Sequence, residues 1–140
     1  IGSNVAAGIT LSENNIADGG SLTVNASAMT SAALTFNASN DTDGSVSITA
    51  GGSGDHQITL SQGNDTYTST STAGEDVTAT GGNNTITTGD GADTIIGGTG
   101  DDNMSGQNGA DTFQFATANF NSSDTVSGGN GDDTIVITST

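Results

Sequence analysis

The sequence predicts an all-β fold in which short parallel strands stack as the coils of a solenoid. A nine-residue block of six turn-forming and three strand-forming residues fills residues 88–114 and returns at 128–136. A second repeat, with a period of twelve residues, precedes it over residues 23–51. Only 30% of the 140 residues are hydrophobic, which is thin for a globular core but sufficient for the narrow apolar ladder of a repeat architecture.

Residues 1–50 are expected to form wider solenoid coils with a cap at their start. The repeat units are TVNAS at 23–27, TFNAS at 35–39 and SITAG at 47–51. Alternation of polar and apolar residues predicts strands at 22–25, 34–37 and 46–49, with Val24, Phe36 and Ile48 facing inward. GITLS at 8–12 predicts one earlier strand. The alternative for this part of the chain is a separate β-sandwich domain.

Residues 51–140 are expected to form a roll of nine-residue blocks that continues the wider coils. The first four blocks are GGSGDHQIT at 51–59, LSQGNDTYT at 60–68, TSTAGEDVT at 70–78 and ATGGNNTIT at 79–87. Their eighth residues, Ile58, Tyr67, Val77 and Ile86, keep the inward apolar ladder. Their sixth residues are His56, Asp65, Glu75 and Asn84, so aspartate is kept only once.

Residues 88–114 carry the most regular blocks, TGDGADTII, GGTGDDNMS and GQNGADTFQ. The middle block and GGNGDDTIV at 128–136 match G-G-x-G-x-D-x-U-x at every fixed position, where U is a large apolar residue. Glycine accepts the backbone angles of tight turns, and Thr, Ile, Val and Phe favour strands. Each block is therefore half a coil, with Ile95, Met104, Phe113 and Ile135 facing inward.

Four extra residues at 115–118, FATA, interrupt the nine-residue repeat and are expected to bulge outward. Phe115 and Phe120 are expected to cover this interruption. The next block is then NFNSSDTVS at 119–127, with Asp124 sixth and Val126 eighth. Every second block lies on the same edge of the solenoid. We therefore expect Asp124 beside Asp102, and Asp133 on the edge of Asp93 and Asp111.

The sixth-position carboxylates stand at the ends of glycine turns whose carbonyl groups are expected to point inward. Calcium in proteins takes six to eight oxygen ligands from carboxylates and backbone carbonyls and tolerates irregular geometry. One turn offers too few oxygens, so an ion would be shared between stacked blocks. The alternative is that Asp and Gly merely populate surface turns, but ordinary turns do not recur every nine residues.

These blocks resemble the repeats-in-toxin (RTX) family of secreted bacterial proteins, closely over residues 79–136 and more loosely back to residue 51. The chain is most similar to RTX-type surface-layer proteins. The resemblance implies a right-handed parallel β-roll, several calcium ions in the edge turns, and folding after export through a type I secretion channel. Thr88 and Gln107 replace glycines of the motif, which makes their turns less ideal.

The metal ligands that follow from the motif and the resemblance are side chains at the sixth position and carbonyl groups of the turns. The side chains are Asp93, Asp102, Asp111, Asp133, Asp124, Asn84 and Asp65. The backbone carbonyls are those of Gly89, Gly91, Gly98, Gly100, Gly109, Gly129 and Gly131.

The charge of the chain supports a need for cations. Sixteen acidic residues and no Lys or Arg give a formal charge of −16, so no salt bridge is expected inside the protein. Self-repulsion opposes a compact state, and we expect disorder without divalent ions. The same charge argues against nucleic acid as a partner. No apolar run approaches the roughly 18 residues of a membrane span.

The sequence favours a structural calcium-binding segment of a secreted bacterial surface protein that assembles into a lattice or filament, with cell-surface polysaccharide as a further partner. We expect no enzyme: G-x-S-x-G and H-E-x-x-H are missing, and His56, the single histidine, lacks catalytic companions. The alternatives are a segment of a giant RTX adhesin, or a folding and secretion module of an exported enzyme. A remote alternative is an ice-binding face made of outward Thr, Ser and Asn pairs.

Overall fold

A computed structural model describes residues 6–13 and 15–139, which form thirteen strands and no helix. The strands are β1 (Ala7–Thr10), β2 (Ser21–Ala26), β3 (Leu34–Asn37), β4 (Ser45–Ala50), β5 (Gln57–Thr59), β6 (Thr66–Ser69), β7 (Asp76–Thr78), β8 (Thr85–Thr87), β9 (Thr94–Gly97), β10 (Asn103–Ser105), β11 (Thr112–Ala116), β12 (Thr125–Ser127) and β13 (Thr134–Thr138). Within the described residues, no helix is long and apolar enough to cross a membrane.

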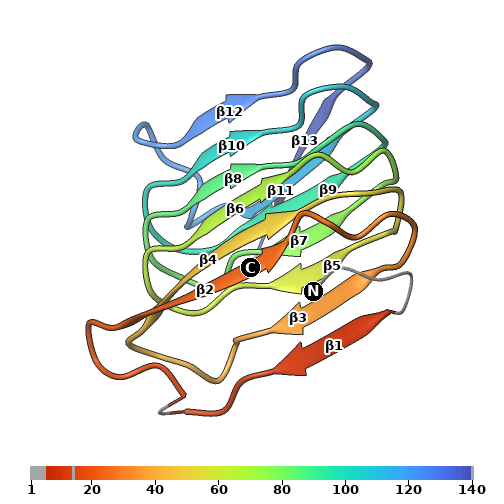
Figure 1. The fold of residues 1–140 in the computed structure, drawn as a ribbon. Helices are drawn as coiled ribbons and strands as arrows, with labels where there is room; N and C mark the ends of the chain where they lie inside the picture. Colours follow the sequence, from red (N-terminus) through yellow and green to blue (C-terminus); the bar gives the residue numbers. More distant parts are fainter. Residues whose placement is uncertain (1–5, 14, 140) are drawn as a thin grey trace.

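The strands form two parallel sheets that face each other (Figure 1), which confirms the predicted solenoid. Odd-numbered strands make a seven-stranded sheet in the order β1-β3-β5-β7-β9-β11-β13, and even-numbered strands make a six-stranded sheet. Each coil therefore contributes one strand to each sheet. Residues 1–5, where the predicted cap begins, lie outside the described residues.

Coil length follows the repeats. Thr94 pairs with Thr112, 18 residues later, as two nine-residue blocks require. Ser21 pairs with Ser45, 24 residues later, as two twelve-residue units require. The alternative of a separate sandwich domain is wrong, because β3 pairs with β5 and β4 pairs with β6, so both sheets continue past residue 50.

The predicted inward residues form the core. These buried side chains are Val24, Phe36, Ile48, Ile58, Tyr67, Val77, Ile86, Ile95, Met104 and Phe113. Ile135 pairs with Phe113 as expected but is 49% exposed, so its prediction as a buried core residue is wrong. It lies in β13, the edge strand of its sheet, where no described coil follows to cover it.

The core is wider in the early coils than in the late ones. Strands β2 and β4 have six residues each, and β4 turns Val46, Ile48 and Ala50 inward, whereas most later strands bury a single large residue. Of the 17 buried hydrophobic residues larger than alanine, 12 precede Thr78 and five follow Thr85. Apolar burial therefore stabilises the early coils more strongly than the late ones.

The insertion at 115–118 does not simply bulge outward. Phe115 extends β11, pairs with Gly97 and Ile137, and is fully buried. A Cβ on Gly97 would overlap the Phe115 ring, so the glycine makes room for it. Phe120 covers the Phe115 ring with a centroid distance of 4.7 Å, as expected. The turn of the insertion comes later, at residues 117–119.

Replacement of Gly109 by alanine is expected to destabilise the fold. Gly109 has a φ of 140°, and a Cβ there would overlap the carbonyl oxygen of Gly91 in the preceding coil. Backbone strain of this kind costs about 1–3 kcal/mol. The measurement is the free energy of unfolding in calcium buffer. Gly8→Ala is the control, since its added Cβ meets no atom within 4 Å; equal stabilities of the two variants would contradict the packing described.

Candidate metal centre

The sixth residues of the blocks stack in two columns, one at each edge of the solenoid. Each stands directly before a strand, so the parallel pairing that aligns the strands also aligns these residues. One column contains His56, Glu75, Asp93, Asp111 and Asp133, and the other contains Asp65, Asn84, Asp102 and Asp124. The predicted neighbours of Asp124 and Asp133 are therefore confirmed.

A hydrogen-bond ladder runs along each column. The backbone N–H of Asp93 donates to Oδ1 of Asp111 at 2.9 Å, and the N–H of Asp111 donates to Oδ1 of Asp133 at 3.0 Å. The same bond joins four further pairs: Glu75 to Asp93 (2.8 Å), Asp65 to Asn84 (3.0 Å), Asn84 to Asp102 (3.0 Å) and Asp102 to Asp124 (2.9 Å). One carboxylate oxygen of each aspartate thus ties its coil to the preceding coil.

The second carboxylate oxygen is the notable atom of the site. Oδ2 of Asp93, Asp102 and Asp111 is buried and has no hydrogen-bond partner among the described residues. Buried polar atoms are nearly always paired, because loss of hydration without compensation is costly. These three oxygens are therefore suited to a cation rather than to a protein donor.

The glycine turns add carbonyl oxygens to this arrangement. Gly91, Gly100, Gly109, Gly129 and Gly131 all have positive φ angles. The carbonyl of Gly91 approaches Gly109, and that of Gly109 approaches Gly131, so these carbonyls line up along one edge. Among the backbone hydrogen bonds of the described turns, none ends on the carbonyl oxygens of Gly91, Gly98, Gly109, Gly129 and Gly131, whereas the Gly89 carbonyl belongs to the bridge between Asp90 and Asn108. The Gly100 carbonyl accepts a long contact, 3.5 Å, from the side chain of Asn121.

The donor set fits calcium. In the described part of the chain, no three His, Asp or Glu side chains gather around one point. We call a sixth-position side chain together with the turn before it a corner of the solenoid. The carboxylate oxygens at each corner must therefore be supplemented by carbonyl oxygens, and calcium accepts such mixtures. Asp93, Asp102 and Asp111, with the neighbouring turn carbonyls, would hold the ions. Gln107 shows the cost of a missing glycine, because it has a φ of 68°.

The remaining predicted ligands differ from these three. Oδ1 of Asp65 accepts the N–H of Val46 at 2.7 Å and its Oδ2 lies 2.9 Å from the Ser61 hydroxyl, while the Asn84 amide nitrogen donates to turn carbonyls. Asp124 is half-buried, and its Oδ2 accepts the N–H of Asn121 at 2.8 Å. Asp133 is exposed at the end of its column. All seven side chains were predicted to be metal ligands, but only Asp93, Asp102 and Asp111 keep a buried oxygen without a hydrogen-bond donor among the described residues.

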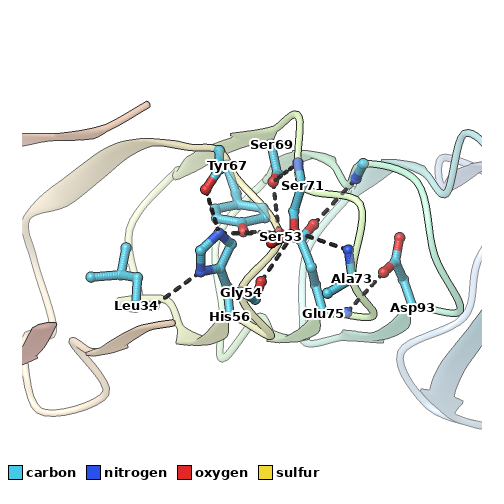
Figure 2. A network of polar contacts seen from close by, with 12 residues as sticks. Leu34, Ser53, Gly54, His56, Tyr67, Ser69, Ser71, Ala73, Glu75 and Asp93 are labelled. Atoms are coloured by element: carbon cyan, nitrogen blue, oxygen red, sulfur yellow. Dashed lines mark hydrogen bonds and ion pairs between the residues drawn. The ribbon is translucent and has the colours of Figure 1, made fainter. Parts of the chain in front are cut away.

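Glu75 leaves its column and enters the core (Figure 2). Its Oε1 accepts hydrogen bonds from Tyr67 (2.9 Å) and Ser69 (2.6 Å), and its Oε2 accepts the N–H of Gly89 at 3.2 Å. Sequence reasoning missed this cluster. The sequence feature that could have indicated it is Ser69, the single residue added between two blocks, whose hydroxyl lies beside the Glu75 carboxylate.

His56 adjoins the same cluster as a buried structural residue. Its Nδ1 accepts the N–H of Leu34 at 2.9 Å, and its Nε2 lies 3.2 Å from the carbonyl oxygen of Gly51. Nε2 also lies 3.9 Å from Oε1 of Glu75. Because Nδ1 accepts a hydrogen bond, it carries no proton and the imidazole is uncharged, so this contact is polar and not a salt bridge between opposite charges.

The chelated protein is expected to gain β-structure on acidification from pH 8 to pH 5. Burial raises the pKa of Asp93 from 3.8 to about 7, and burial also raises the pKa values of Asp65, Asp102 and Asp111. The folded state then binds more protons than the unfolded state, so stability without calcium falls as the pH rises through this window. Circular dichroism in EDTA provides the test. Loss of strand signal on acidification over the same range would contradict the assigned burial of these carboxyl groups.

Comparison with known proteins supports a calcium site at these corners. The family model of the RTX calcium-binding nonapeptide repeat (4 copies) matches residues 78–113 and 120–136. These ranges contain Asp93, Asp102, Asp111, Asp124 and Asp133. No curated protein and no solved structure matches the chain.

Proposed function

We propose that the chain is a non-catalytic structural segment of a secreted bacterial surface protein. The reason is that residues 78–113 and 120–136 match the RTX calcium-binding nonapeptide repeat. RTX nonapeptide repeats bind calcium ions, and they occur in secreted bacterial proteins. The observation that carries the proposal is the set of three buried carboxylate oxygens without a hydrogen-bond donor, on Asp93, Asp102 and Asp111.

The residues of the corners perform two tasks in this proposal. In Asp93, Asp102 and Asp111, Oδ1 fixes the spacing between coils through the ladder bond, and Oδ2 offers negative charge to the space beside the glycine turn. A bound calcium ion supplies the positive charge that this acidic chain lacks. The glycine carbonyls complete the oxygen set without adding further charge to a chain of −16.

The coil that contains β13 exposes an apolar strand edge. Strand β13 is the edge of the seven-stranded sheet, and its Ile135 and Ile137 are 49% and 44% exposed. An exposed apolar edge strand favours pairing with a further strand. Another parallel coil, of this chain or of a second molecule, would continue both the sheet and the apolar ladder. Repetition of this contact gives filaments or a lattice of the surface-layer type.

Replacement of Ile137 by serine is expected to reduce assembly in calcium buffer. The change removes apolar surface from the terminal strand only. Ile96→Ser is the matched control, since Ile96 is also an exposed isoleucine (36%) but lies in β9, inside the sheet. Electron microscopy and light scattering provide the readout. Ordered sheets or filaments that disappear in Ile137→Ser support the proposal, whereas dispersed monomers of the original protein would favour an adhesin segment or a secretion module.

A second candidate partner is a neutral polysaccharide of the cell surface. The outward residues of β6, β8, β10 and β12 are Thr66, Thr68, Thr85, Thr87, Asn103, Ser105, Thr125 and Ser127, which lie in register. This face carries no acid although the chain has sixteen, which favours a neutral, hydroxyl-rich ligand. Adsorption to insoluble polysaccharide tests this candidate, and adsorption to ice tests the remote alternative.

A further inference from the structure

The side-chain amide of Asn84 makes the contacts that a bound cation would make at this position. Its Nδ2 lies 3.0 Å from the carbonyl oxygen of Gly81, 3.2 Å from that of Gly82 and 2.9 Å from Oδ1 of Asp102 in the next coil. Its Oδ1 accepts the N–H of Asp65, which fixes the orientation of the amide. One nitrogen thus contacts two turn carbonyls and one carboxylate, which are the oxygen types that calcium binds.

In two earlier turns, serine hydroxyls at the second position of the block contact oxygens of the same kinds. Ser61 Oγ contacts both oxygens of Asp65, at 2.7 and 2.9 Å, and the carbonyl oxygen of Gly44 at 2.9 Å. In the other column, Ser71 Oγ donates to the carbonyl oxygen of Gly54 at 3.0 Å. The carboxylate of Asp65 therefore has protein donors in the Val46 N–H and the Ser61 hydroxyl, and the Gly54 carbonyl has one in the Ser71 hydroxyl.

Glu75 is satisfied in the same way, by Tyr67, Ser69 and the N–H of Gly89 (Figure 2). The carboxylates of Asp93, Asp102 and Asp111 contrast with it, because each keeps one buried oxygen without a donor. Sixth-position side chains that are paired with protein groups thus end at residue 84, and carboxylates with an unpaired buried oxygen begin at residue 93. Residues 6–77 also precede the region that matches the calcium-binding repeat.

We infer that protein hydrogen-bond donors replace calcium in the coils before Gly89, so that residues 6–84 fold without calcium and serve as the base on which the calcium-binding coils assemble. The inference rests on the proposed function for the later coils. The wider core agrees with it, since 12 of the 17 large buried apolar residues precede Thr78. Solenoid coils interact mainly with their neighbours, so one end can remain folded while the other end unfolds.

Hydrogen exchange of the complete chain, followed by mass spectrometry with and without calcium, tests the inference. Strands β2 to β6 are expected to keep their protected amides in EDTA, while β9 to β12 lose theirs. Loss of protection in all these strands together would overturn the inference and leave calcium-dependent folding intact. Unchanged protection in β9 to β12 would instead contradict the proposed function itself.

The variant Asn84→Asp tests the replacement at a single atom. It exchanges the donating amide for a carboxylate oxygen and should raise the number of bound calcium ions by one, as counted by native mass spectrometry. Asn83→Asp is the matched control, because it adds the same charge at an exposed neighbouring position and should leave the number unchanged. An unaltered ion count in Asn84→Asp, with the variant folded, would show that the amide does not stand in for calcium.

Discussion

Chelation of calcium is expected to abolish the coils formed by residues 88–139. These coils bury few large apolar residues, and eight of the sixteen acids lie after residue 84. Without cations, Asp93 and Asp111 in one column and Asp102 in the other would each keep a buried carboxylate oxygen unpaired. Such a segment has too little apolar burial to overcome its charge and chain entropy. Far-UV circular dichroism should therefore lose a large part of its β signal in EDTA.

Return of calcium should restore the signal cooperatively, at the roughly 10⁻⁴–10⁻³ M that extracellular calcium modules require. Two controls separate binding from screening. Sodium chloride at equal ionic strength only screens charge. Magnesium demands a near-ideal octahedral site and should restore the fold poorly. Full recovery with sodium alone would show that the corners need only weaker repulsion and no bound ion.

Asp111→Ala should weaken folding and calcium binding far more than Asp55→Ala. Asp111 is joined to both neighbouring coils, because its Oδ1 accepts the N–H of Asp93 and its own N–H donates to Asp133. Its removal leaves a buried N–H unpaired, which costs about 1–3 kcal/mol, and also removes an ion ligand. Asp55 is exposed, and surface changes usually stay within about 0.5 kcal/mol.

The measurement for Asp111 is the calcium concentration at the midpoint of folding. Asp111→Asn divides the effect, since its amide oxygen can keep the ladder bond, as Asn84 does with Asp65, while the ligand charge is lost. The asparagine variant should therefore lie between the original protein and Asp111→Ala. Equal midpoints for Asp111→Ala and Asp55→Ala would mean that the column of sixth residues has no special role.

Much of the fold could be predicted because the repeat periods determine it. A period of nine with one inward apolar residue places Ile95, Met104 and Phe113 in one core. Stacking of every second block also placed Asp124 beside Asp102 across a break in the repeat. These relations depend only on residue spacing and on the alternation of strand side chains, which the sequence contains.

Other features depend on side-chain packing in three dimensions. Phe115 was expected outside the core, but the small Gly97 in the preceding coil leaves room for its ring. Glu75 has one more methylene than aspartate, which lets its carboxylate reach Tyr67 in the core. Asn84 occupies a position that the repeat assigns to a metal ligand. Only the contacts of its amide nitrogen show that it donates hydrogen bonds to the oxygens that a metal ion would bind.

A crystal structure grown with calcium, with ions located by anomalous scattering, tests the central claim most directly. We predict a peak within the 2.3–2.6 Å bonding range of calcium from Oδ2 of Asp93, of Asp102 and of Asp111. No peak is expected at Asn84. Carboxylates turned toward protein donors or solvent, with no peak between the stacked turns, would contradict the claim that these corners hold ions.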